Sequence, residues 1–284
     1  MHRKYPEHKI FSTTSIEIKP ISSLTIKSDF TIDLRNKESD EFYPTMTEKG
    51  LRRDINYREQ FFDRDNHWLS ETIATYAQVF GRHHISAMAG FTADFKRLHS
   101  REVYSRGYPD NDINSSIWDQ ANDWTSNTPK ESKYEQTMVS FLARLGYSFD
   151  DRYFAEFNFG YNGSENFSPG RRFGFFPSVA LGWMISNEKF FDGARDVVDA
   201  LKIKGSYGVV GNDKIGGDRR FIYDDVYATL SNVYQFGSQA SWVNGLYLQE
   251  LGNRNVSWEK AYKLNLGIEL SLFNSIRISA DYFR

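Results

Sequence analysis

Apolar and polar residues alternate along about ten stretches of this chain, most of them about ten residues or longer. In residues 24–35, Leu24, Ile26, Phe30, Ile32 and Leu34 share one face, and mainly charged or hydroxyl-bearing residues share the other. Because successive side chains of a β-strand point to opposite faces, this pattern predicts strands with one apolar and one polar face. The apolar face can meet either a protein core or lipid.

The predicted strands are joined by connections that alternate between short and long. We expect strands near residues 10–20, 24–35, 68–80, 84–98, 139–149, 153–161, 173–185, 201–209, 262–272 and 276–282. Short turns are predicted near 21–23, 81–83, 150–152 and 273–275, with a longer connection at 187–200 in which residues 192–200 form one or two helical turns. Long polar loops are predicted near 36–67, 99–134, 163–172 and 212–256.

This alternation favours an all-β, antiparallel up-and-down transmembrane barrel segment, with periplasmic turns and extracellular loops. A strand of about 11 residues, tilted by ~40°, spans on the order of 28 Å, which is close to the thickness of a bilayer core. Aromatic residues gather near both ends of the predicted strands, as in interfacial girdles. They are Tyr147, Phe149 and Tyr153 at the short-turn end and Phe159, Tyr161, Phe173 and Phe175 at the other.

Composition narrows the alternatives. The formal net charge of -2 argues against a nucleic-acid partner held by phosphate neutralisation. The mean hydropathy of -0.58, with no run of about 18 apolar residues, excludes a helical membrane protein. Cysteine is absent, so thiolate metal sites and disulfides are not expected. No apolar stretch follows the basic N-terminus, so no secretory signal is predicted.

Several strings in the second half resemble signatures of the SusC/RagA family of TonB-linked outer-membrane proteins. They are residues 176–190 around Gly182 and Trp183, residues 201–212, and residues 251–260 followed by 265–267 and 281–284. Arg254 stands where the family commonly has proline. The motif positions expected to have structural roles are Pro177, Gly182, Trp183, Tyr207, Gly208, Gly211, Asn212, Gly252, Asn253, Trp258 and Glu259.

The resemblance implies a specific context. Family members are described as barrels of 22 strands closed around a plug domain, so nine or ten strands would be part of such a barrel, without the plug. It also implies import of oligosaccharides or peptides, with TonB and a SusD-like surface lipoprotein as partners, in the outer membrane. No cofactor and no enzymatic activity are expected.

Other motifs favour ordinary structural explanations. His83 and His84 are adjacent and would point to opposite faces, which does not suit a metal site. The segment 110–121 starts like a calcium loop but has Ser115 and Ala121 where glycine and glutamate are needed. The carboxylate pairs at 150–151 and 224–225 have no histidine partner that would indicate catalysis.

Aromatic residues in two predicted loops are candidates for ligand binding, because stacking faces beside amide and carboxyl groups suit sugars or peptides. They are Tyr108, Trp118 and Trp124 in one loop and Tyr234, Trp242 and Tyr247 in the other. Packing of the loops against each other or against a lid partner is the alternative explanation and is slightly favoured over ligand contact. Two other classes stay open: a secreted all-β carbohydrate-binding or adhesion module, and an outer-membrane enzyme barrel.

Overall fold

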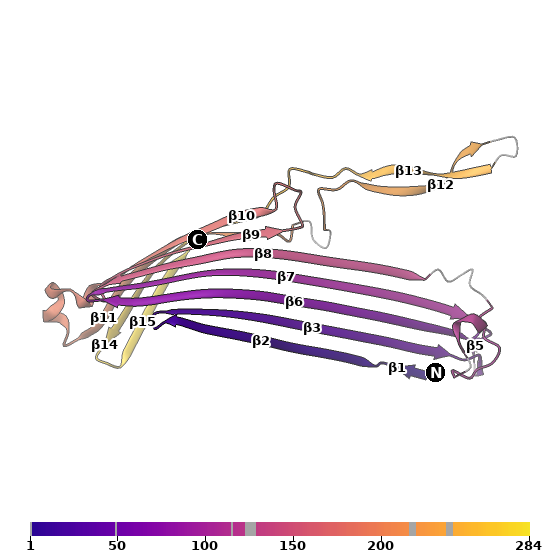
Figure 1. Cartoon of the computed structure of the whole chain (residues 1–284), viewed down its shortest axis with the longest axis horizontal. Helices are drawn as coiled ribbons and strands as arrows, with labels where there is room; N and C mark the ends of the chain where they lie inside the picture. The colour runs from indigo at the N-terminus through magenta and orange to yellow at the C-terminus, as the bar shows by residue number, and fades with distance from the viewer. Residues whose placement is uncertain (1, 49, 115, 123–128, 216–219, 237–240) are drawn as a thin grey trace. The chain divides into compact units, whose positions relative to one another are not determined.

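A computed structural model describes residues 2–48, 50–114, 116–122, 129–215, 220–236 and 241–284. Its main feature is an 11-stranded sheet in which neighbours along the chain pair with one another (Figure 1). The strands of this sheet are β1 (His2–Lys4), β2 (Glu7–Ile21), β3 (Leu24–Tyr43), β6 (Tyr57–Phe80), β7 (His83–Arg106), β8 (Lys130–Phe149), β9 (Tyr153–Ser164), β10 (Phe173–Met184), β11 (Val198–Asn212), β14 (Glu259–Leu272) and β15 (Ile276–Phe283). The expected antiparallel up-and-down order is therefore confirmed.

The strands β1 and β2 both pair with β3, so they occupy one position in the sheet order. The remaining described elements are small. They are β4 (Met46–Glu48) paired with β5 (Leu51–Arg53), β12 (Val226–Phe236) paired with β13 (Ser241–Glu250), and three 3₁₀ helices, η1 (Trp118–Gln120), η2 (Ile185–Asn187) and η3 (Lys189–Ala194). No helix in the described ranges is long and apolar enough to cross a membrane.

The chain divides into two compact units. Unit 1 comprises residues 1–16, 28–71 and 93–137, and unit 2 comprises residues 17–27, 72–92 and 138–284. In unit 1, Phe42, Tyr108 and Ala121 form a small buried cluster with Ile113 packed against it. The buried Asn56 holds this region together, because its amide oxygen accepts the N–H of Tyr108 (2.7 Å) and its Nδ2 donates to the carbonyl of Asp110 (2.5 Å).

Unit 2 contains two tight hairpin turns that fix the strand register. Asp150 and Asp151 have φ angles of 55° and 52°, and Phe273 and Asn274 have φ angles of 53° and 51°. Two successive residues with positive φ match the right-handed twist of the flanking strands. The turn at 150–151 sets a register that places Leu145 opposite Phe157 and Tyr147 opposite Ala155 on β8 and β9, so the apolar faces of the two strands coincide.

The strands of unit 1 continue beyond the predicted ends, so the predicted loop bounds 36–67 and 99–134 were too wide. β3 extends to Tyr43, β6 begins at Tyr57, β7 extends to Arg106 and β8 begins at Lys130. The apolar alternation stops in these extensions, and polar pairs join the strands instead. Examples are Arg35 with Asp65 (3.2 Å), Arg97 with Glu135 (2.6 Å) and Lys130 with Glu102 (3.2 Å).

Three other bounds need correction. The loop predicted at 212–256 contains the β12–β13 hairpin, and helical geometry in the 187–200 connection covers 189–194 while β11 already starts at Val198. The first strand includes Pro20 instead of ending there. β2 has only β3 as a long neighbour, and an edge strand tolerates the missing N–H of proline on its unpaired side.

A second buried cluster closes the end of β10 in unit 2. Phe167, Phe176 and Trp258 are 0%, 8% and 8% exposed, and the Trp258 ring meets the Phe176 ring edge-on at 5.1 Å. The Phe176 ring lies where a side chain on Gly174 or Gly211 would project, so neither position has room for a Cβ atom. Glycine is therefore required at these two positions by packing.

We expect Gly211→Ala to lower the free energy of unfolding by about 1–3 kcal/mol, because the added methyl group overpacks the Phe176 ring. Adding Phe176→Leu to this variant should recover part of the loss, as a double-mutant cycle would measure by denaturant unfolding. Gly193→Ala is the control, since nothing lies within 4 Å of a Cβ atom at that position. Equal losses for both glycine variants would contradict the packing explanation.

Candidate functional site: the polar face of the sheet

The sheet in unit 2 has two chemically distinct faces. On the apolar face, Leu145, Leu181 and Tyr262 are 56%, 61% and 62% exposed. Exposed apolar side chains continued over adjacent strands mark a surface that contacts another apolar phase. The polar face carries the alternate residues of the same strands, and its ionic side chains include Arg144, Glu156, Lys202, Lys204, Glu269 and Asp281.

Lys204 is the centre of an ionic group on this polar face. Its Nζ lies 2.6 Å from Glu269 Oε1 and 3.3 Å from Asp281 Oδ1, and thus links β11 to β14 and β15. A Cβ atom on Gly267 would collide with the Lys204 side chain and with Asp281. Gly267 therefore leaves the space that the lysine needs to reach both carboxylates.

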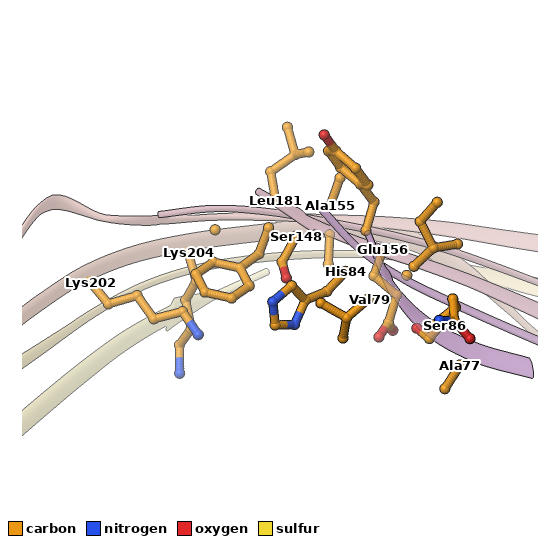
Figure 2. Close-up of a pocket in the computed structure, with 17 residues that line it drawn as sticks. Ala77, Val79, His84, Ser86, Ser148, Ala155, Glu156, Leu181, Lys202 and Lys204 are labelled. Carbon is orange, nitrogen blue, oxygen red and sulfur yellow. The ribbon is translucent and has the colours of Figure 1, made fainter. Parts of the chain in front are cut away.

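A shallow pocket lies on the polar face near the short-turn ends of the strands. Figure 2 shows His84, Ser148, Glu156 and Lys202 on the same side of the strands, with Leu181 on the other side. Lys202 Nζ lies 4.9 Å from the centre of the Phe154 ring, and this cation–π contact holds the ammonium group near the sheet. Gly146 and Gly182 also line the pocket, and because they carry no side chain they leave its base open.

The side chains that line this pocket are suited to binding polar groups. It combines an imidazole, hydroxyl groups, a carboxylate and two ammonium groups over a shallow, open surface. Such a surface can exchange hydrogen bonds with water or with a polar polypeptide or ligand. Within the described ranges, no group of three or more His, Cys, Asp or Glu side chains is arranged to hold a metal ion.

The motif residue Trp183 belongs to a hydrogen-bonded cluster beside the connection that follows β10. Glu188 is 9% exposed and accepts hydrogen bonds from the Tyr153 hydroxyl (2.6 Å) and from Trp183 Nε1 (3.2 Å). Arg152 Nη1 lies 3.4 Å from the same carboxylate. The pKa of Glu188 lies below its usual value. The hydrogen bond from the Tyr153 hydroxyl lowers it most, and the Trp183 indole and Arg152 lower it further.

The other motif residues also have structural contacts. Trp258 Nε1 donates to the carbonyl of Arg172 (2.9 Å), and Asn212 Nδ2 donates to Glu259 Oε2 (2.9 Å). The N–H groups of Gly252 and Asn253 bond to Asp225 Oδ1 and to the carbonyl of Ile222, both at 2.8 Å. Pro177 pairs with Phe159, Gly208 lies against Ser178, and Gly182 lies near Lys202 and Phe154, whereas Tyr207 is half exposed on the apolar face.

Two aromatics of the first predicted loop, Tyr108 and Trp118, lie in different environments. Tyr108 is 6% exposed and its hydroxyl shares a hydrogen bond with Ser105 Oγ (2.5 Å), so its ring packs the loop and is not presented to a ligand. Trp118 is partly exposed, donates its indole N–H to Gln60 and meets Phe62 edge-on. Trp124 lies outside the described residues.

The second group lies on the β12–β13 hairpin, where the rings are about half exposed. Tyr234 pairs with Val243, and Trp242 pairs with Gln235. Because Trp242 precedes Val243 by one residue, it faces the opposite side of the hairpin from Tyr234, whereas Tyr247 shares the side of Tyr234. The three aromatics therefore do not form one binding surface, and ligand contact through them stays a prediction.

Some residues that organise unit 2 were not predicted from the sequence. Phe167 is fully buried although it lies in an irregular loop. Asp213 is 8% exposed, accepts the Ser164 hydroxyl (2.7 Å) and also contacts Asn166. No periodicity marks such loop residues, because their partners come from distant parts of the sequence.

Comparison with known proteins gives related sequences and structures over nearly the whole chain. The chain is 28% identical to TonB-dependent receptors P39 and P3 of Formosa agariphila, over 96% and 93% of its length. It is 34% identical to the TonB-dependent receptor SusC of Bacteroides thetaiotaomicron over 52% of its length. A solved structure of the RagAB peptide transporter superposes on 99% of the chain with a TM-score of 0.82 and 22% identity.

The chain is SusC/RagA-like: it is similar in sequence to TonB-dependent receptors, SusC among them, and similar in fold to the RagAB peptide transporter. It spans about a quarter of the length of the Formosa relatives and 30% of the RagAB transporter chain. No protein-family model matches it. The superposition covers residues before 138 as well as after, so the fold similarity of this SusC/RagA-like chain includes the region that carries no family motif.

The Glu188 cluster predicts a pH-dependent stability. Since the folded-state pKa is lowered, the stabilisation is present above the pKa of an unfolded glutamate, about 4.3, and is lost as pH falls through the lower folded-state pKa. We expect Glu188→Gln to reduce the melting temperature of the detergent-solubilised protein at pH 7, and this difference from wild type to shrink below about pH 4.

The matched control is Glu48→Gln, which changes an exposed glutamate. It should leave the melting temperature unchanged at both pH values. A difference between wild type and Glu188→Gln that stays constant across the pH range would contradict the role given to the carboxylate.

Proposed function

We propose that this chain forms part of the wall of a TonB-dependent outer-membrane receptor that imports oligosaccharides or peptides. The observation that carries the proposal is the two-faced antiparallel sheet, with exposed apolar residues on one face and the ionic group around Lys204 on the other. A water-filled or plugged lumen needs the polar face, and lipid needs the apolar face. The similarity to SusC and to the TonB-dependent receptors of Formosa supports the same function.

The proposal includes partners. A SusD-like surface lipoprotein would act with the receptor, and TonB would supply energy through other parts of the receptor. The RagAB structure is named as a peptide transporter, which supports import but does not decide between peptides and oligosaccharides for this chain. We assign no catalytic role to the residues of the sheet.

The apolar face makes a secreted binding module the weaker alternative. A soluble module would leave side chains such as Leu145, Leu181 and Ile268 in water, where each exposed apolar side chain forgoes about 1.5–3 kcal/mol of burial energy. Contact with acyl chains removes this cost. The β-sheet ladder also pairs the backbone polar groups between strands, which a membrane-spanning strand requires.

The test combines membrane placement with uptake. In a strain lacking the complete receptor gene, wild-type receptor should restore uptake of one of two labelled pools, oligosaccharides or peptides, in a manner abolished by a proton uncoupler. Leu145→Arg should reduce the amount of receptor in the outer membrane and the uptake, because a charge facing lipid near the bilayer midplane costs about 2–4 kcal/mol.

Ser140→Arg is the matched control, because it adds the same side chain to the polar face of the same strand. This variant should retain wild-type levels in the outer membrane. Equal tolerance of both arginines would contradict the lipid-facing assignment. Unchanged uptake of both pools without the gene would contradict the proposed transport function.

A further inference from the structure

Three aromatic rings form a continuous row on the apolar face of unit 1. Phe30 of β3 and Trp68 of β6 have ring centroids 6.3 Å apart, and Trp68 and Phe95 of β7 have ring centroids 5.7 Å apart. Phe30 shares its face with Ile26 and Leu34 by the period of two. Rows of this kind lie at the level where acyl chains give way to headgroups.

Beyond this aromatic row, the following residues on the same face of the strands include several cationic side chains. Arg97 is two residues after Phe95, and its guanidinium group lies 5.5 Å from the Phe95 ring centre. Arg101 follows by a further even number of residues, and Arg64 precedes Trp68 by an even number on β6, so both share this face. We call Arg64, Arg97, His99, Arg101 and Lys133 the basic rim.

Carboxylates neutralise only part of the basic rim. Glu131 lies 2.5 Å from His99 Nε2, 3.5 Å from Arg101 and 3.6 Å from Lys133, so three basic groups share one carboxylate. Glu135 pairs with Arg97. Arg64 is exposed and makes no ion pair within the described ranges. Its guanidinium group is therefore available to an external anion.

A hollow among these strands supplies a place for such an anion. It is lined by the basic or amide side chains of His8, Asn36, Lys37, Arg64, His99 and Arg101, and also by Phe62 and the carboxylates of Glu38 and Asp63. The histidine and asparagine side chains are hydrogen-bond donors, and the two guanidinium groups match the geometry of a phosphate. The hollow thus offers donors from four adjacent strands, β2, β3, β6 and β7.

We propose that the basic rim binds the phosphate groups of an anionic glycolipid in the outer leaflet of the membrane. The acyl chains of this lipid would lie against the aromatic row and the apolar face below it. That continuity selects a lipid over free phosphate, because free phosphate would use the charges alone. The inference rests on the membrane placement in the proposed function.

The test uses the complete receptor reconstituted into phosphatidylcholine vesicles that contain a minor fraction of phosphorylated lipid A. The amount of lipid A retained after detergent extraction is measured by native mass spectrometry. Arg64→Gln combined with Arg101→Gln should lower retention about thirtyfold, since each of the two cations near a lipid surface contributes about 1 kcal/mol.

Lys9→Gln combined with Lys96→Gln is the matched control. These lysines pair with Asp33 and Asp65 on the polar face of neighbouring strands, so removing the same amount of charge there should leave retention unchanged. Inorganic phosphate added as a competitor should not displace the lipid.

The other outcomes overturn different parts of the proposal. Equal retention by wild type and the basic-rim variant, with the receptor inserted, overturns the inference alone. Full displacement by inorganic phosphate overturns the lipid as the occupant. A receptor that does not float with the vesicles overturns the membrane placement, and the inference with it.

Discussion

Pairing of the backbone between neighbouring strands is the constraint on which the rest of this structure depends. A strand in an apolar environment must give every N–H and C=O group a partner in the adjacent strand, and the antiparallel ladder does this without help from side chains. Side chains are then free to differ completely between the two faces. The apolar face, the ionic group of Lys204 and the aromatic row of unit 1 all follow from a register that keeps like residues together.

Small residues control where the large ones lie. Gly267 leaves room for Lys204 to reach two carboxylates, and Gly211 leaves room for the Phe176 ring. The residues that carry the SusC/RagA resemblance are therefore largely residues that shape the wall and its rims. This agrees with the proposed function, which depends on holding a lumen and loops in place, and it explains why the motifs do not reveal a substrate.

The sequence predicted the strands of unit 2 well because both faces follow the period of two up to turns such as Asp150–Asp151. It predicted the ends of β3, β6, β7 and β8 poorly, because beyond the apolar region these strands are joined by polar pairs such as Arg97–Glu135, which leave no apolar alternation. The sequence predicted the polar face that carries the candidate site, but it did not predict the side-chain contacts within that face. The burial of Tyr108 and the position of Phe167 depend on partners far apart in the sequence, and no local pattern encodes them.

The central claim is that one face of this sheet meets lipid and the other meets water. Because the chain contains no cysteine, single cysteines can be introduced at each position from 153 to 161 of β9 in the complete receptor and labelled with a nitroxide. Collision rates with oxygen and with a water-soluble nickel chelate then report the environment of each position. We predict a period of two, with oxygen collisions highest at 155, 157 and 159 and nickel collisions highest at 154, 156 and 158. Uniform rates along β9, or the opposite phase, would contradict the assignment of the two faces.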